Sequence, residues 1–153
     1  MFRVLMMAVA LSSTAASLSA AGPADVRLTV EDVQQITHLT PLHLVKPGEL
    51  PGAGPGLNFA TADNKLLLMV NAGDAAQYAR AKEQKTPVPV FHAAVAGIGD
   101  EAFDAPSGSL QYVIYLRKGA NSASVTTYLD RGMTPRIPRA QLEAIARLVA
   151  SRL

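Results

Sequence analysis

The 153-residue sequence predicts an α+β fold, in which a largely antiparallel sheet of about five strands has helices packed on one face. Two segments have the pattern of β-hairpins, because stretches of alternating apolar residues flank short turn sequences. Three other segments have apolar residues at helical spacing. The expected order is α-β-β-α-β-β-β-α, without the repeated β-α-β units that build a parallel sheet.

The first 21 residues have the layout of a secretory signal peptide. Met1-Phe2-Arg3 supplies one positive charge, Val4 to Leu11 is continuously apolar, and Ser12 to Ala21 is uncharged and rich in small residues. Signal peptidase recognises this arrangement, and the apolar run is much shorter than the ~20 residues that a spanning helix needs. We expect cleavage after Ala21 or one residue earlier. The product would be a single periplasmic or secreted domain of residues 22–153.

Charge and cysteine content argue against several classes of protein. Without Arg3, the only charged residue of the signal, 13 Lys and Arg stand against 12 Asp and Glu, and neither sign forms a run. A nucleic-acid-binding face needs concentrated positive charge, so no nucleic-acid partner is expected. The sequence has no cysteine that could carry a lipid after the signal. We therefore expect no membrane anchor after signal cleavage.

The exported region begins with a short helix and continues with a segment rich in proline and glycine. Thr29-Val30-Glu31-Asp32 has the form of a capping box, and Val33, Ile36 and Leu39 follow at helical spacing. Residues 41–56 contain four Pro and four Gly, which remove backbone donors and add backbone freedom. We expect no regular element there. The segment is either a functional loop or, as its few reactive side chains favour, a mobile one.

A hairpin, a helix and a strand are predicted in the middle of the chain. Asp63-Asn64 offers turn chemistry between two apolar runs. Gly73-Asp74 is expected to cap a helix, because the segment that follows has an apolar stripe. The expected elements are strands 57–61 and 65–71, a helix over 75–84, a strand over 88–96 and a turn-rich connection over 97–108.

The C-terminal third contains the clearest hairpin and the last helix. Strands 110–117 and 122–129 are joined by a turn at 118–121, and Ile137-Pro138 opens the helix. Alternate strand residues and one helix stripe form the predicted core. These residues are Leu110, Tyr112, Ile114 and Leu116, then Ala123, Val125, Thr127 and Leu129, and finally Leu142, Ile145, Leu148, Val149 and Leu153.

Four segments carry a resemblance to a known family: Leu28–Val33, Gly97–Phe103, Tyr112–Gly119 and Leu148–Leu153. Over residues 28–153 the chain resembles a group of secreted bacterial domains of unknown function, many of them lipoproteins. Their layout is also similar to the extracellular sensor domains of mycobacterial Ser/Thr kinases. The resemblance implies an α+β domain that binds or senses outside the cytoplasm, with no catalytic residues to carry over. This chain lacks the lipid-carrying Cys, the paired Cys and the kinase domain.

Residues that could support catalysis occur without a recognisable catalytic spacing. His38 and His43 lie five residues apart near Glu49, and His92 lies in a predicted strand, whereas zinc sites need three or four convergent ligands. No Gly-x-Ser-x-Gly elbow is present. Asp100 is expected to cap backbone amides in a tight turn. We therefore predict no catalytic residue, no metal site and no cofactor.

The predicted binding surface is the sheet face opposite the core. Tyr115, Arg117 and Tyr128 occupy alternate positions on the two strands of the last hairpin, so they are expected to share a solvated face. Tyr and Arg are favoured in interfaces. We interpret the protein as an exported, non-enzymatic binding or interaction module for a protein or small-molecule partner. It would work through this face or through segment 41–56. The alternative is a small periplasmic hydrolase or metal-dependent enzyme that uses His43 or His92.

Overall fold

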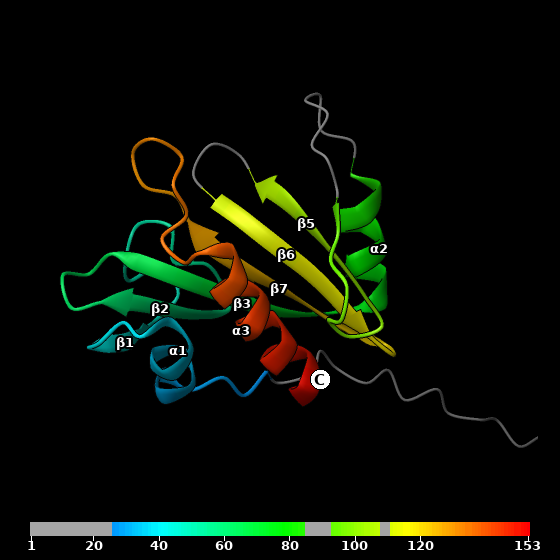
Figure 1. Ribbon diagram of the computed structural model, residues 1–153, viewed down its shortest axis with the longest axis horizontal. Helices are drawn as coiled ribbons and strands as arrows, with labels where there is room; N and C mark the ends of the chain where they lie inside the picture. The colour runs from blue at the N-terminus through cyan, green and yellow to red at the C-terminus, as the bar shows by residue number, and fades with distance from the viewer. Residues whose placement is uncertain (1–25, 85–92, 108–110) are drawn as a thin grey trace, which may run out of the picture.

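The computed structural model describes residues 26–84, 93–107 and 111–153 (Figure 1). These residues form seven strands in one antiparallel sheet, ordered β1-β2-β3-β7-β6-β5-β4, and three helices. The α+β class is as predicted, with seven strands in place of about five. The elements are α1 (Val30–Thr37), β1 (Leu42–Val45), β2 (Leu57–Thr61), β3 (Leu66–Asp74), α2 (Ala75–Glu83), β4 (Ala93–Ala94), β5 (Glu101–Ser107), β6 (Gln111–Lys118), β7 (Asn121–Tyr128) and α3 (Arg139–Arg152).

Part of what the sequence predicts falls outside the described residues. This holds for the signal peptide over 1–21, for His92, for Leu110 and for most of the strand expected over 88–96. Among the residues that are described, no helix is long and apolar enough to cross a membrane.

The first two helices begin at the predicted caps. The backbone N–H of Thr29 donates to Asp32 Oδ2 over 2.9 Å, and the N–H of Asp32 donates to Thr29 Oγ1 over 3.2 Å. Asp74 and Gln77 exchange the same pair of bonds at the start of α2. Each pair satisfies backbone donors that the first turn of a helix leaves free. Asp74 is also the last residue of β3, so strand and helix meet without a linker.

Two strands lie where irregular chain is expected. β1, Leu42–Val45, lies inside segment 41–56 and pairs with β2. β5, Glu101–Ser107, lies inside the expected connection 97–108 and pairs with β6 along its whole length, but with β4 at only two positions. β1 is an edge strand, and β5 pairs with β4 only at Phe103 and Asp104, so short length or proline is tolerated in both. The proline and glycine content of both segments therefore did not prevent strand pairing.

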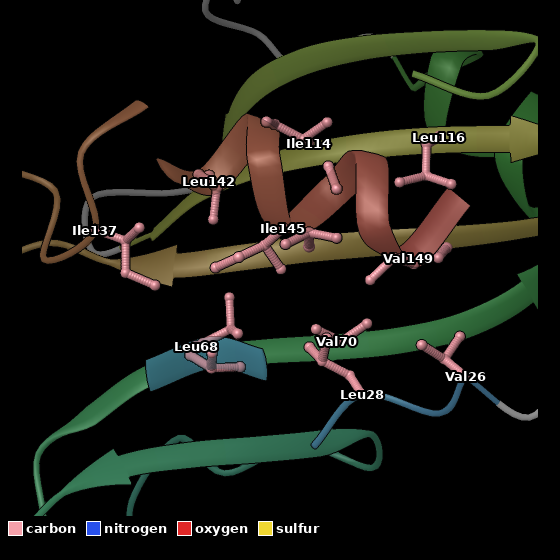
Figure 2. Packing of buried hydrophobic residues seen from close by; sticks show 14 of the residues in the cluster. Val26, Leu28, Leu68, Val70, Ile114, Leu116, Ile137, Leu142, Ile145 and Val149 are labelled. Carbon is pink, nitrogen blue, oxygen red and sulfur yellow. The ribbon is translucent and has the colours of Figure 1, made fainter. Parts of the chain in front are cut away.

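One face of the sheet, called here the core face, is covered by α3 and α1 (Figure 1). Figure 2 shows Leu142, Ile145 and Val149 of α3 lying over the side chains of the sheet. Ile114 and Leu116 of β6 are completely buried beneath them. The predicted core is confirmed for the residues that are buried, namely Ile114, Leu116, Ala123, Val125, Thr127, Leu129, Leu142, Ile145 and Val149.

The opposite face, called here the second face, is also covered, so the prediction of helices on a single face is wrong. Tyr78 of α2 packs edge-on against Phe103, with ring centroids 5.3 Å apart, and Phe103 stacks on Tyr115 at 5.0 Å. At the other end of this face, residues 46–56, called here the loop segment, lie over a small cluster that contains Tyr128. Adjacent strand residues point to opposite faces, and the sheet has apolar side chains on both of them. In the small cluster under the loop segment, Tyr128 packs with Val45, Ala60 and Leu66.

Candidate functional site

The second face carries a wide, open pocket of about 1160 Å³ between α2 and the loop segment, called here the α2 pocket. Its floor is the sheet, where register places Asn71, Ser124 and Tyr115 side by side on β3, β7 and β6. Its rim continues over the edge of β3 to Val26. The walls include Gln77, Tyr78, Arg80, Ala81 and Gln84 of α2 and, opposite them, Pro47, Pro55 and Gly56.

A buried amide fixes the wall formed by the loop segment. The side chain of Asn58 is completely buried and accepts a hydrogen bond from the Gly54 N–H over 3.1 Å. Its Nδ2 donates to the carbonyls of Gly54 and Gly56, both at 2.9 Å. The hydroxyl of Tyr128 donates to the carbonyl of Gly52 over 2.8 Å. These bonds satisfy backbone groups that no strand partner reaches, so they hold the proline-rich wall in place.

Gly56 allows this wall to approach β3 very closely. A Cβ added at Gly56 would lie 2.1 Å from the carbonyl oxygen of Val70 and 2.3 Å from Asn71 Oδ1. Since the first of these atoms belongs to the backbone, no side-chain rotation could relieve the contact. The close approach also shields Asn71 Oδ1 from water, and its accessible area is below 1 Å².

The opposite wall is positioned by the junction between β3 and α2. Besides the capping box, Ser122 Oγ of β7 donates to the carbonyl of Asp74 over 2.7 Å. A Cβ on Gly73 would meet Gln77 Oε1 at 2.1 Å, so the capping side chain lies directly against the strand. The helix start is therefore bonded to both β3 and β7. This anchorage holds Tyr78, one turn further on, against the sheet.

Two buried polar atoms of the pocket lining have no hydrogen-bond partner among the described residues: Asn71 Oδ1 and Tyr78 Oη. Buried polar atoms are paired in the great majority of cases, and an unpaired one costs about 1–3 kcal/mol. Burial, with a smaller contribution from the charge of Glu101, raises the pKa of Tyr78 to about 12. Tyr78 is thus a neutral phenol that can donate a hydrogen bond, whereas Asn71 Oδ1 can only accept one.

The charge of the lining is unbalanced. Arg80 is the one charged residue among the described residues of the lining, and no carboxylate belongs to it. Beside the pocket, Lys82 pairs with Glu101, and Arg117 lies 3.9 Å from Glu101 and 3.7 Å from Asp100. Those acids are already engaged. The pocket is therefore neutral to weakly positive.

The three predicted binding residues share one face, as expected, but they do not form one site. Tyr115 lines the α2 pocket. Arg117 is half-buried in its ion pairs and also donates to the carbonyl of Gly119 over 3.1 Å. Tyr128 is only 8% exposed, so the expectation that it lies on a solvated face is wrong. The reason is the loop segment, which folds over Tyr128 and takes up its hydroxyl.

Two of the three candidate histidines, His38 and His43, lie within the described residues. His38 closes α1 with a left-handed backbone, and His43 is exposed on β1, the edge strand of the sheet. Asp100 Oδ2 accepts the N–H of Gly119 over 2.7 Å, which confirms its predicted capping role. Within the described ranges no three His, Cys, Asp or Glu residues are close enough to hold a metal ion.

Asn71 and Tyr78 were not singled out from the sequence. A signal for Asn71 exists, since it is a polar residue at the end of the apolar run Leu66–Val70. Nothing local marks Tyr78, which reads as part of the thin apolar stripe of α2. Comparisons with protein-family models, with curated proteins and with solved structures found no match. The site is therefore interpreted from its own geometry.

Proposed function

We propose that this protein is an exported, non-enzymatic binding module and that its ligand occupies the α2 pocket. The observation that carries the proposal is the pair of unpartnered buried atoms, Asn71 Oδ1 and Tyr78 Oη, in one pocket lining. Leaving both atoms unpaired destabilises the free protein. Both atoms have accessible areas below 1 Å², so a ligand would donate to Asn71 and accept from Tyr78 only after these side chains turn toward the pocket, and the new bonds would then offset this destabilisation.

The remaining lining supports binding rather than acid–base chemistry. Its described residues supply amides, hydroxyls, aromatic rings and one guanidinium, and none of them is Asp, Glu, His or Cys. Such a lining suits a polar ligand that is uncharged or carries a negative charge. Tyr115 is the predicted binding residue that belongs to this site. Tyr128 and the loop segment act on it indirectly, by holding one wall.

Export is part of the same proposal and rests on the signal-peptide pattern of residues 1–21. We expect a mature chain that begins near Ala21 or Gly22 and fractionates as a soluble protein outside the cytoplasm. N-terminal sequencing of the protein from separated cell fractions measures this directly. Cytoplasmic material that retains Met1 would contradict it.

Binding is tested with a substitution that fills the pocket. Ser124 lies at the centre of the floor, so Ser124→Tyr should block the ligand while β7 keeps its pairing. Gln111→Tyr is the matched control, because Gln111 is a half-exposed strand residue on the same face but outside the lining. Mature protein is incubated with periplasmic extract, and the retained compounds are measured by native mass spectrometry.

We expect the same compound on the wild-type protein and on Gln111→Tyr, and none on Ser124→Tyr. Circular dichroism establishes that both variants are folded. If folded Ser124→Tyr retains the same compounds as the other two proteins, the ligand does not lie in the α2 pocket. If no compound is retained by any of the three, the proposal of a pocket ligand loses its support.

A further inference from the structure

We propose that the ligand of the α2 pocket is an extended peptide that pairs as an additional short strand with the open edge of β3. This inference rests on the proposed function and names its ligand class. It is carried by the backbone of β3, and the side chains of the pocket add to it.

β3 has an open edge beside the pocket. Its pairing with β2 ends at Leu57↔Val70, whereas its pairing with β7 continues to Asp74↔Asn121. In the part of the chain that the structure describes, β3 therefore has a strand neighbour on only one side beyond Val70. The α2 pocket lies against this stretch, since Val70, Asn71, Ala72 and Gly73 all belong to its lining.

The direction of the peptide groups shows which of them are open. The carbonyl oxygen of Val70 points toward Gly56, on the side of β2. Peptide groups alternate in direction along a strand, so the N–H and C=O of Ala72 point to the same side. Two residues further on, the N–H of Asp74 also points there and is taken by Gln77 Oε1 at 3.1 Å. Ala72 lies between these satisfied positions and has no partner on the open side among the described residues.

A peptide backbone is the ligand that complements this edge. One residue of an added strand offers a donor and an acceptor at the spacing of the Ala72 N–H and C=O, as in other cases of β-strand addition. The small side chains of Ala72 and Gly73 leave room for the approach. The strand would be short, because Gly56 and Gln77 bound the edge at its two ends.

The charge of the pocket adds a preference within this class. Arg80 lines the pocket and forms no ion pair with any described residue. An acidic peptide side chain would therefore meet an unpaired guanidinium and no competing carboxylate. The expected ligand is an extended peptide with an acidic residue near its centre.

The probes are capped pentapeptides, acetyl-Val-Glu-Val-Thr-Val-amide and copies with Gln or Lys in place of Glu. Each is titrated into ¹⁵N-labelled mature protein. A copy of the first peptide in which the central Val is N-methylated removes one backbone donor without changing any side chain. We expect saturable shifts at Ala72 and Ser124 with the Glu peptide, at least tenfold weaker binding of its N-methylated copy, and affinities in the order Glu, Gln, Lys.

Ala72→Pro provides the protein-side test, because proline removes the N–H of an edge residue and is tolerated at strand edges. It should bind the Glu peptide at least tenfold more weakly, while Gln111→Tyr, which lies outside the pocket lining, should bind it as the wild type does. The N-methylated probe gives the same test on unmodified protein if Ala72→Pro does not fold.

Equal binding of the peptide and its N-methylated copy would overturn strand addition, as would the absence of binding by all of the peptides. Maltotetraose and chitotetraose are titrated in parallel. They distinguish failure of the peptide inference from failure of the proposed binding function. A saccharide that binds the wild type but not Ser124→Tyr would leave the pocket as a binding site and exclude the peptide. If neither class binds, the peptide inference fails and the proposed function loses support with it.

Discussion

The two faces of the sheet are packed in different ways. On the core face, α3 closes one continuous apolar cluster, and the buried hydroxyl of Thr127 is satisfied twice, by the carbonyl of Leu67 and by the N–H of Ile137, each at 3.1 Å. On the second face, two small clusters lie apart, and the pocket between them contains two unpaired polar atoms. The first face accounts for the stability of the fold. On the second face, two buried polar atoms without a described partner lower the stability instead, as the proposed ligand site would require.

The largest effects are expected on the core face. Leu116→Ala and Ile145→Ala each remove a completely buried aliphatic side chain and should lower the free energy of unfolding by about 2–5 kcal/mol. Urea unfolding followed by circular dichroism measures this. Leu44→Ala is the control, since Leu44 is 52% exposed, and it should change stability by about 0.5 kcal/mol or less. Equal losses for all three variants would remove the distinction between core and surface.

Asn58→Ala should give the largest effect on the second face. It deletes three hydrogen bonds to the backbone of Gly54 and Gly56 and leaves those groups unsatisfied, so we expect a loss of about 2–4 kcal/mol. The wall of the pocket should loosen as well, and peptide binding should weaken more than it does in Leu116→Ala. A variant with unchanged stability and unchanged binding would show that Asn58 does not hold this wall.

Removing two tyrosine hydroxyls tests the difference between a hydrogen-bonded and an unpaired polar group on the second face. Tyr128→Phe removes the bond to the carbonyl of Gly52 and should cost about 0.5–1.5 kcal/mol. Tyr78→Phe removes a buried hydroxyl that has no partner among the described residues, so stability should stay the same or rise. Thermal melts of both variants are compared with the wild type. A loss in Tyr78→Phe as large as that in Tyr128→Phe would mean that Tyr78 Oη is satisfied in solution.

The last prediction concerns the pH dependence of stability, which the ion pair between Asp32 and Arg152 at the edge of the core face should produce at low pH. Hydrogen bonds from Arg152, together with those of the capping box, hold the pKa of Asp32 well below its usual value of 3.8. A lowered pKa means that the stabilisation is complete above the unfolded-state value and is lost as the pH falls below about 4. Asp32→Asn should therefore be less stable than the wild type at pH 6, and the difference should shrink toward pH 2. Parallel stability curves over this range would contradict the assignment.

Local chemistry made much of the fold predictable. The capping residues Thr29 and Asp74 marked the starts of two helices, and alternation along residues 110–129 gave the central hairpin. β1 was missed because its partner is distant in the sequence, and β5 was missed because its own sequence favours turns although its partner is the next strand. Leu42 pairs with Thr61, and β5 is held by β6, across residues whose local sequence favours turns.

The candidate site was less predictable than the fold, for a physical reason. The alternation of side chains along the strand placed Tyr115 on the correct face of the sheet. It does not predict which segments pack on that face. The burial of Tyr128 depends on the fold of the loop segment, and the pocket exists because α2 and that segment cover opposite ends of the same face. Such long-range packing leaves no periodic trace in the sequence. An Asn at the end of an apolar strand was the one local sign of the site.

The packing of α3 has a consequence for the order of folding. Leu142, Ile145 and Val149 close the core face, and Arg152 binds Asp32, so α1 and α3 are joined directly although they lie far apart in the sequence. A sheet without α3 has an uncovered core face and cannot complete the cooperative fold. Contacts of such long sequence separation carry a larger loop-closure cost than the local hairpin of β6 and β7. We therefore expect the docking of α3 to follow the pairing of that hairpin.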